Sequence, residues 1–178
     1  MADTDRTIAA LQTLLADNTS GAISAQDVRD MLVSLSVKYG DMYISTPSAT
    51  TIGNTTNYYD VAGTYTGGTF KQFDMNTNGQ LRYTGTPTIE VFVFANLSLT
   101  VAGNNDIIHL EFRKNGVDVA GSDAMRKVAT GTDVGSMSIV GITSMATNDY
   151  LTIAVRNETA TDNVTGEEAH VLAVGLAI

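Results

Sequence analysis

The amino-acid sequence predicts a mainly β protein: an antiparallel jelly-roll sandwich preceded by a short N-terminal α-helical hairpin. Short segments in which apolar and polar residues alternate fill most of the chain after residue 57, and such alternation is typical of strands in antiparallel sheets. Gly, Asn and Asp turn signals separate these segments. No helical pattern alternates with them, which argues against a parallel βαβ sheet.

The composition indicates a globular chain and limits its partners. Of the 178 residues, 43% are hydrophobic and 16% are charged, which is too apolar for a disordered chain. The formal net charge of −9 argues against binding to a nucleic acid backbone or to an anionic membrane surface. We therefore expect no nucleic acid partner and no membrane partner. The sequence holds no cysteine, which excludes disulfides and cysteine-based zinc sites.

Two short helices are expected within residues 1–40. Residues 3–16 carry apolar side chains on one stripe and acids at the start, and DNTSG at 17–21 ends this helix. The segment GAISAQDVRDMLVSL follows, in which Ser24 is the expected N-cap and Asp27 stands in the place of a capping box. Together they predict an αα-hairpin.

Each of these helices is too short to be stable alone, and their joint apolar stripe is too small for a core of its own. The hairpin must therefore pack on copies of itself, on the β-domain or on another protein. We treat its apolar side chains as candidate attachment residues: Ile8, Leu11, Leu15, Val28, Met31, Leu32 and Leu35.

The stretch STPSATTIGNTTN, residues 45–57, is rich in Thr, Ser and Asn and has no periodicity, so it predicts a linker or an extended arm. The expected organisation is a helical anchor at 1–40, a linker at 41–57 and a jelly-roll domain at 58–178. Strand segments in that domain are expected at 58–65, 70–75, 80–85, 88–101, 106–120, 125–129, 134–143, 148–158 and 170–178.

The strongest of these segments, residues 88–101, has two apolar faces. Its odd positions from Ile89 to Leu99 form a core face, while Phe92 and Phe94 lie on the opposite face, which would be polar if it met water. The last segment is apolar on both faces as well. This sheet is therefore expected to be covered twice, by the second sheet and by another copy of the protein, or alternatively by a loop or the hairpin of the same chain.

Four segments in order resemble the C1q/TNF-like jelly roll over residues 58–178: TIEVFVFANLSL, IIHLEFRKNGVDVAGSD, VGSMSIVGITSMATNDYLTIAVRNET and HVLAVGLAI. Asn148-Asp149-Tyr150-Leu151 departs from the Gly-Asp that this family usually has. The resemblance implies a homotrimer whose inner sheet faces the threefold axis. The candidate trimer-interface residues are Phe92, Phe94, Tyr150, Val171 and Ala173.

The pattern G-x-I-S-A-Q-D-V-R-D-x-L-x-S-L, within residues 18–37, resembles N-terminal segments of tailed-bacteriophage virion proteins. Together the two resemblances imply a phage structural protein, made in the host cytoplasm and located on the virion surface. The first expectation is a trimeric capsid decoration (cement) protein that binds the major capsid protein and bridges capsomers. The alternative is a tail-tip or fibre receptor-binding head that is held by a tail protein and recognises a host glycan or protein.

No catalytic, cofactor-binding or metal-binding residues are predicted, and we expect a protein without enzymatic activity. His109 and His170 are the two histidines. His109 shares a strand face with Glu111 and Arg113, which predicts a solvated polar face. The Asn- and Asp-rich stretches at 74–79, 103–106 and 161–168 lack EF-hand spacing and predict turns.

Overall fold

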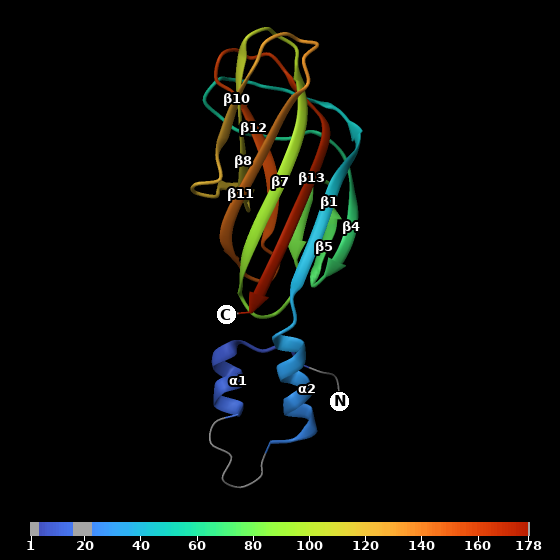
Figure 1. Ribbon diagram of the computed structural model, residues 1–178, viewed down its shortest axis with the longest axis vertical. Coiled ribbons are helices and arrows are strands. Elements are labelled where there is room, and N and C mark those ends of the chain that lie inside the picture. Colours follow the sequence, from blue (N-terminus) through green and yellow to red (C-terminus); the bar gives the residue numbers. More distant parts are fainter. Residues whose placement is uncertain (1–3, 16–22, 178) are drawn as a thin grey trace.

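The computed structural model describes residues 4–15 and 23–177, and within them two short helices precede a sandwich of strands (Figure 1). The helices are α1 (Ile8–Leu14) and α2 (Ala25–Ser34). The strands are β1 (Lys38–Pro47), β2 (Ala49–Thr50), β3 (Tyr59–Asp60), β4 (Gly63–Lys71), β5 (Phe73–Thr77), β6 (Gln80–Tyr83), β7 (Ile89–Val101), β8 (Asp106–Lys114), β9 (Val117–Asp118), β10 (Ala124–Val128), β11 (Gly135–Met145), β12 (Tyr150–Asn157) and β13 (Val164–Ala177).

The strands form two antiparallel sheets. Sheet A has the order β11-β7-β13-β1-β4, with β2 beside β13. Sheet B has the order β10-β8-β12-β6-β5, with β3 beside β12 and β9 beside β8. Successive long strands switch between the sheets: β6 in sheet B is followed by β7 in sheet A, β8 in B, β11 in A, β12 in B and β13 in A. This crossing order is a jelly roll, and the predicted mainly β fold class is confirmed.

The core lies between the two sheets and follows the predicted alternation. In β7, the side chains at odd positions from Ile89 to Leu99 are completely buried. They meet inward side chains of sheet B, among them Phe112 of β8 and Ile153 of β12. Because successive strand residues point to opposite faces, this alternation also fixes which residues of sheet A point outward.

The predicted linker at 41–57 is wrong over residues 41–50, where β1 and β2 lie, while residues 51–57 form no strand. Strand β1 lies inside sheet A, where Met42 pairs with Val171 of β13 on one side and with Gly67 of β4 on the other. Met42 and Ile44 are buried between the sheets. The jelly-roll domain thus spans residues 38–177 of the described chain, rather than beginning at 58.

The helical hairpin lies at the end of the sandwich where β1 begins and β13 ends (Figure 1). The predicted N-cap Ser24 is confirmed: its hydroxyl accepts from the backbone N–H of Asp27, and the Asp27 side chain completes the capping box. The predicted turn at 17–21 lies outside the described residues. Within the described part of the chain, neither helix is long and apolar enough to cross a membrane.

Candidate functional site

The outward face of sheet A carries a patch of apolar side chains, here called the outer patch. Strand register places its members in two adjacent rows across β11, β7, β13 and β1. The first row is Ile142, Phe92, Val174 and Tyr39, and the second is Val140, Phe94 and Leu172, with Asp41 at its end.

The outer patch is open to solvent in a single chain. Ile142 is 68% exposed, Val140 52% and Phe92 49%. Phe94 beside them is half-buried. Exposed apolar side chains grouped in this way make the outer patch a candidate surface for binding another molecule.

Two of the five candidate interface residues, Phe92 and Phe94, lie on this outward face as predicted. The other three do not. Val171 and Ala173 are completely buried between the sheets, because they keep the register of the inward β7 residues. Tyr150 lies on β12 of sheet B, where it pairs with Arg82.

Sequence reasoning missed Val140 and Ile142, the two most exposed members of the outer patch. Their strand, β11, sends Met137 and Ile139 into the core. The positions between the inward residues therefore point outward, and Gly141 between Val140 and Ile142 keeps this alternation. The alternation within residues 135–142 is therefore the sequence signal that identifies both residues as outward-facing.

The helical hairpin is held together by polar contacts around Asp30, which is 1% exposed. Its carboxylate accepts from the backbone N–H of Thr4 at 2.8 Å, from Nε of Arg6 at 2.9 Å and from the amide of Gln26 at 2.7 Å. These bonds, that of Thr4 first, hold the pKa of Asp30 below its ordinary value. Ser34 adds a bond from its hydroxyl to the Asp30 carbonyl at 2.6 Å.

Lys38, the first residue of β1, ties this hairpin to the sandwich. Its side chain is completely buried, and Nζ donates to the carbonyls of Ser34 at 2.7 Å and Val33 at 3.3 Å. An ammonium at the last turn of a helix satisfies carbonyls that have no partner in the helix. The same Nζ lies 3.4 Å from Oδ1 of Asp5.

This arrangement places the seven candidate attachment residues in three environments. Leu11 is buried, whereas Ile8, Leu15 and Met31 are half-buried. Val28, Leu32 and Leu35 are exposed by 42%, 63% and 51%. The hairpin thus presents an apolar stripe on α2 that nothing in its own described chain covers.

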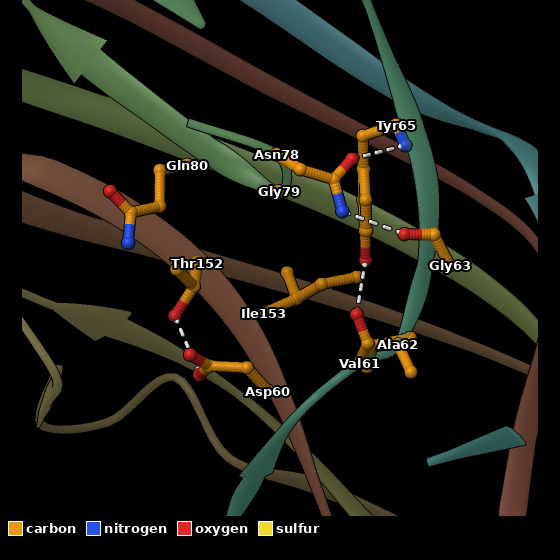
Figure 2. Close-up of a pocket in the computed structure, with 10 residues that line it drawn as sticks. All are labelled: Asp60, Val61, Ala62, Gly63, Tyr65, Asn78, Gly79, Gln80, Thr152 and Ile153. Carbon is orange, nitrogen blue, oxygen red and sulfur yellow. Dashed lines mark hydrogen bonds between the residues drawn. The ribbon is translucent and has the colours of Figure 1, made fainter. Parts of the chain in front are cut away.

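A cavity of about 350 Å³ opens at one edge of the sandwich (Figure 2). Most of its polar groups bind one another: Asn78 accepts from the Tyr65 backbone N–H at 2.7 Å and donates to the Gly63 carbonyl at 2.8 Å. Thr152 donates to Asp60 at 2.9 Å. The lining residues are Asp60, Val61, Ala62, Gly63, Tyr65, Asn78, Gly79, Gln80, Thr152 and Ile153. Asp60 is the one carboxylate among them, so this cavity offers no acid–base pair.

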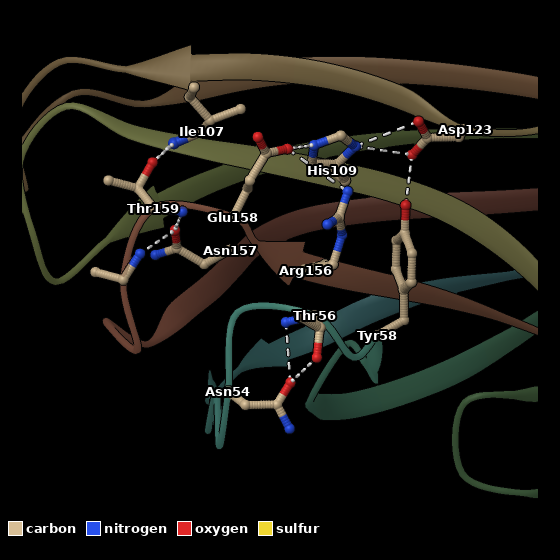
Figure 3. A network of polar contacts seen from close by, with 11 residues as sticks. Asn54, Thr56, Tyr58, Ile107, His109, Asp123, Arg156, Asn157, Glu158 and Thr159 are labelled. Atoms are coloured by element: carbon tan, nitrogen blue, oxygen red, sulfur yellow. Dashed lines mark hydrogen bonds and ion pairs between the residues drawn. The ribbon is translucent and has the colours of Figure 1, made fainter.

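A polar network centred on His109 covers part of the outward face of sheet B (Figure 3). Nδ1 of His109 lies 3.2 Å from both carboxylate oxygens of Asp123, and Nε2 lies 2.6 Å from Oε2 of Glu158. Tyr58 donates to Asp123 at 2.6 Å, and the Arg156 guanidinium lies 5.3 Å from the centre of the Tyr58 ring.

His109 shares the outward face of β8 with Glu111 and Arg113 as predicted, but the face is not solvated there, because His109 is only 6% exposed. Both ring nitrogens already contact carboxylates, so a substrate would have to displace one of them before the imidazole could exchange a proton with it. In the part of the chain that the structure describes, no group of three His, Asp or Glu side chains is arranged to hold a metal ion.

Glu111 is the most perturbed acid of this face. It is 5% exposed, and its Oε1 has no hydrogen-bond partner; the nearest cation is Nε of Arg113 at 3.9 Å. Burial first, and then hydrogen bonding to Asp118, raise the pKa of Glu111 to about 8. Glu111 is therefore neutral over a pH range in which an exposed glutamate is charged.

The Glu111→Gln variant should change how stability depends on pH. Because the pKa is about 8 in the folded protein and 4.5 without its surroundings, the folded state holds the proton more tightly. Stability of the wild type should therefore fall as pH rises from about 4.5 to 8. The variant should lack this fall in stability with pH and be the more stable protein at pH 9.

Thermal unfolding of wild type and variant at pH 5, 7 and 9 measures this difference. Glu168→Gln, which changes an exposed carboxylate, is the control. Equal slopes for Glu111→Gln and wild type would contradict the assignment.

Comparison with known proteins gives fold-level likenesses. No protein family matches the chain, and no curated protein matches it. The crystal structure of murine APRIL at pH 5.0 is 9% identical, with a TM-score of 0.49, over 79% of this chain and 100% of that one. The globular domain of zebrafish complement 1qA protein is 11% identical, with a TM-score of 0.47, over 79% of this chain and 98% of that one. The jelly-roll fold stands on the strand order described above, and likenesses this distant say nothing of activity or partners.

Proposed function

We propose that this protein is a homotrimer that assembles through the outer patch, and that it serves as a non-enzymatic structural protein of a tailed-phage virion, first of all as a capsid decoration protein. The observation that carries the assembly is the outer patch, whose two apolar rows lie on a regular sheet face at 49–68% exposure for its three most open residues. The phage context comes from the N-terminal sequence resemblance.

A ring of three copies explains why the patch spans several strands. In a threefold ring every copy turns the same face toward the axis, and one part of that face contacts a different part of the face of the next copy, so that the ring closes. Burying Phe92, Ile142 and Val140 in this way removes apolar area from water at about 25 cal/mol per Å².

A decoration protein acts by binding to the capsid shell. Three helical hairpins on one trimer would engage three sites on the shell, so that weak single contacts add up to tight attachment through multivalency. The surface charge supports the same role, since a net charge of −9 keeps neighbouring copies on a particle from aggregating. The major capsid protein is the proposed partner.

The alternative, a tail-tip or fibre receptor-binding head, is favoured by the orientation of the molecule. The helices lie at one end of the sandwich, and the turn between β7 and β8 lies at the other (Figure 1). If the helices hold the virion, the opposite loops point away from it, where a host glycan or protein could bind. The copy number in virions separates the two: a number near that of the capsid protein supports decoration, and a number near that of tail fibres supports the head.

Deleting residues 1–36 should remove virion attachment and leave a folded trimer. A cut at residue 40, the boundary suggested by sequence, would remove the start of β1; a cut at 36 keeps it. It removes the partners of Lys38 together, so that this ammonium is solvated and not left buried without a counter-charge. The outer patch is untouched.

The measurement adds purified protein to virions that lack it and quantifies the bound copies. Full-length protein should bind to saturation, and the truncated protein should stay in the supernatant while still sedimenting as a trimer. Binding of the truncated chain at full occupancy would contradict the attachment role of the helices.

A further inference from the structure

Helix α2 turns its polar side toward its own chain and its apolar side toward solvent. Its intrachain side is polar: Asp30 and Ser34 are 1% and 0% exposed and bind the segment before α1. Its other side is apolar and open, with Leu32 63% exposed. A helix normally buries its apolar stripe, so the side of α2 that needs a cover faces away from its own chain.

The open side has the spacing of a coiled-coil seam. Ala25, Val28, Leu32 and Leu35 follow one another at intervals of three, four and three residues. This is the a-d-a-d order of a heptad, in which such side chains interlock with those of the same helix in another chain. All four are exposed, and the intervening Asp30 and Ser34 lie on the opposite side.

The seam continues into the outer patch. Val37, two residues after Leu35, is 45% exposed and keeps the alternation of Tyr39 and Asp41 on β1. Tyr39 belongs to the first row of the patch, beside Val174. Open or half-buried apolar side chains thus follow one another along the chain from Leu35 of the seam through Val37 to Tyr39 of the outer patch.

From this continuity we infer that the α2 helices of three copies pack against one another along their seams, forming a small helix bundle on the axis of the trimer. The inference rests on the proposed trimer: around a threefold axis, a surface continuous with the axis-facing sheet meets its own copies. The bundle also explains how helices of 7 and 10 residues, too short to be stable alone, form a firm anchor. The surface left for the virion is then the outside of the bundle, which includes α1.

Single cysteine variants test this arrangement. Because the wild-type chain has no cysteine, any disulfide between two chains must form between the introduced residues. The Leu32→Cys variant places a thiol in the seam. Thr13→Cys is the matched control: it is exposed on α1, two positions after the buried Leu11 and so on the opposite side of that helix. Each full-length variant is sedimented, oxidised with oxidised glutathione and run on a non-reducing gel.

We expect both variants to be trimers and Leu32→Cys alone to give a disulfide-linked pair of chains, with the third chain of each trimer left unlinked. A trimer without a Leu32→Cys link would overturn the bundle, leave the proposed trimer standing and indicate that the seam contacts another virion protein. Equal linking of Thr13→Cys would also overturn it, since chance collisions would then account for the bond. A monomer would refute the proposed trimer itself.

Discussion

The Phe92→Asp variant should be a folded monomer at micromolar concentration. Phe92 is 49% exposed and points away from the core, so a carboxylate there meets water in the single chain and leaves the sandwich intact. In the trimer it would be buried once per copy in an apolar interface without a partner, at a cost of several kcal/mol for each charge. The sedimented mass should therefore fall to that of one chain, 18.8 kDa.

Met125→Asp is the matched control for this variant. Met125 is a large apolar residue, 72% exposed, on β10 of the other sheet. It lies outside the outer patch, so the same change of charge should leave the mass and the circular dichroism of the assembly unchanged. The outer patch is not the interface if both variants, Phe92→Asp as well as Met125→Asp, remain native trimers.

Moving the same carboxylate by one residue should abolish folding. Val93 is completely buried between the sheets, and Val93→Asp places an unpaired charge in the core. The penalty of several kcal/mol is comparable with the whole stability of a domain, about 5–15 kcal/mol. The variant should lack cooperative thermal unfolding and accumulate as insoluble protein.

The contrast between Val93 and Phe92 makes this second prediction specific. Both residues lie on β7, one position apart, and receive the same side chain. A Val93→Asp protein with a cooperative transition near that of the wild type would show that the strand faces are reversed or that β7 does not separate core from surface.

Alternation made much of the sandwich predictable. The two faces of β7 could be assigned from sequence because apolar residues occupy every odd position from Ile89 to Leu99. The capping box of α2 could be found for a similar reason, since Ser24 and Asp27 are local in sequence and bond to each other.

Strand β1 escaped prediction because its pattern is weak. Met42, Tyr43 and Ile44 follow one another without a clear alternation, and the Thr- and Ser-rich residues after them dominate the segment. What makes it a strand is its two neighbours, β13 and β4, which are distant in sequence. The misplacement of Tyr150 has the same origin, because alternation assigns a face within a sheet but does not say which sheet a strand joins.

The network around His109 was beyond sequence reasoning for a different reason. His109, Tyr58 and Glu158 are far apart in the chain, and loops bring them together. Sequence showed that Glu111 shares the face of His109, but not that Glu111 is buried and hydrogen-bonded to Asp118. Perturbed acids of this kind are a product of tertiary packing.

The central claim, that the outer patch joins three copies, is tested most directly by the mass of the unmodified full-length protein in solution. Sedimentation equilibrium at micromolar concentrations should give three times the chain mass of 18.8 kDa. A mass of one chain across that concentration range would contradict the claim.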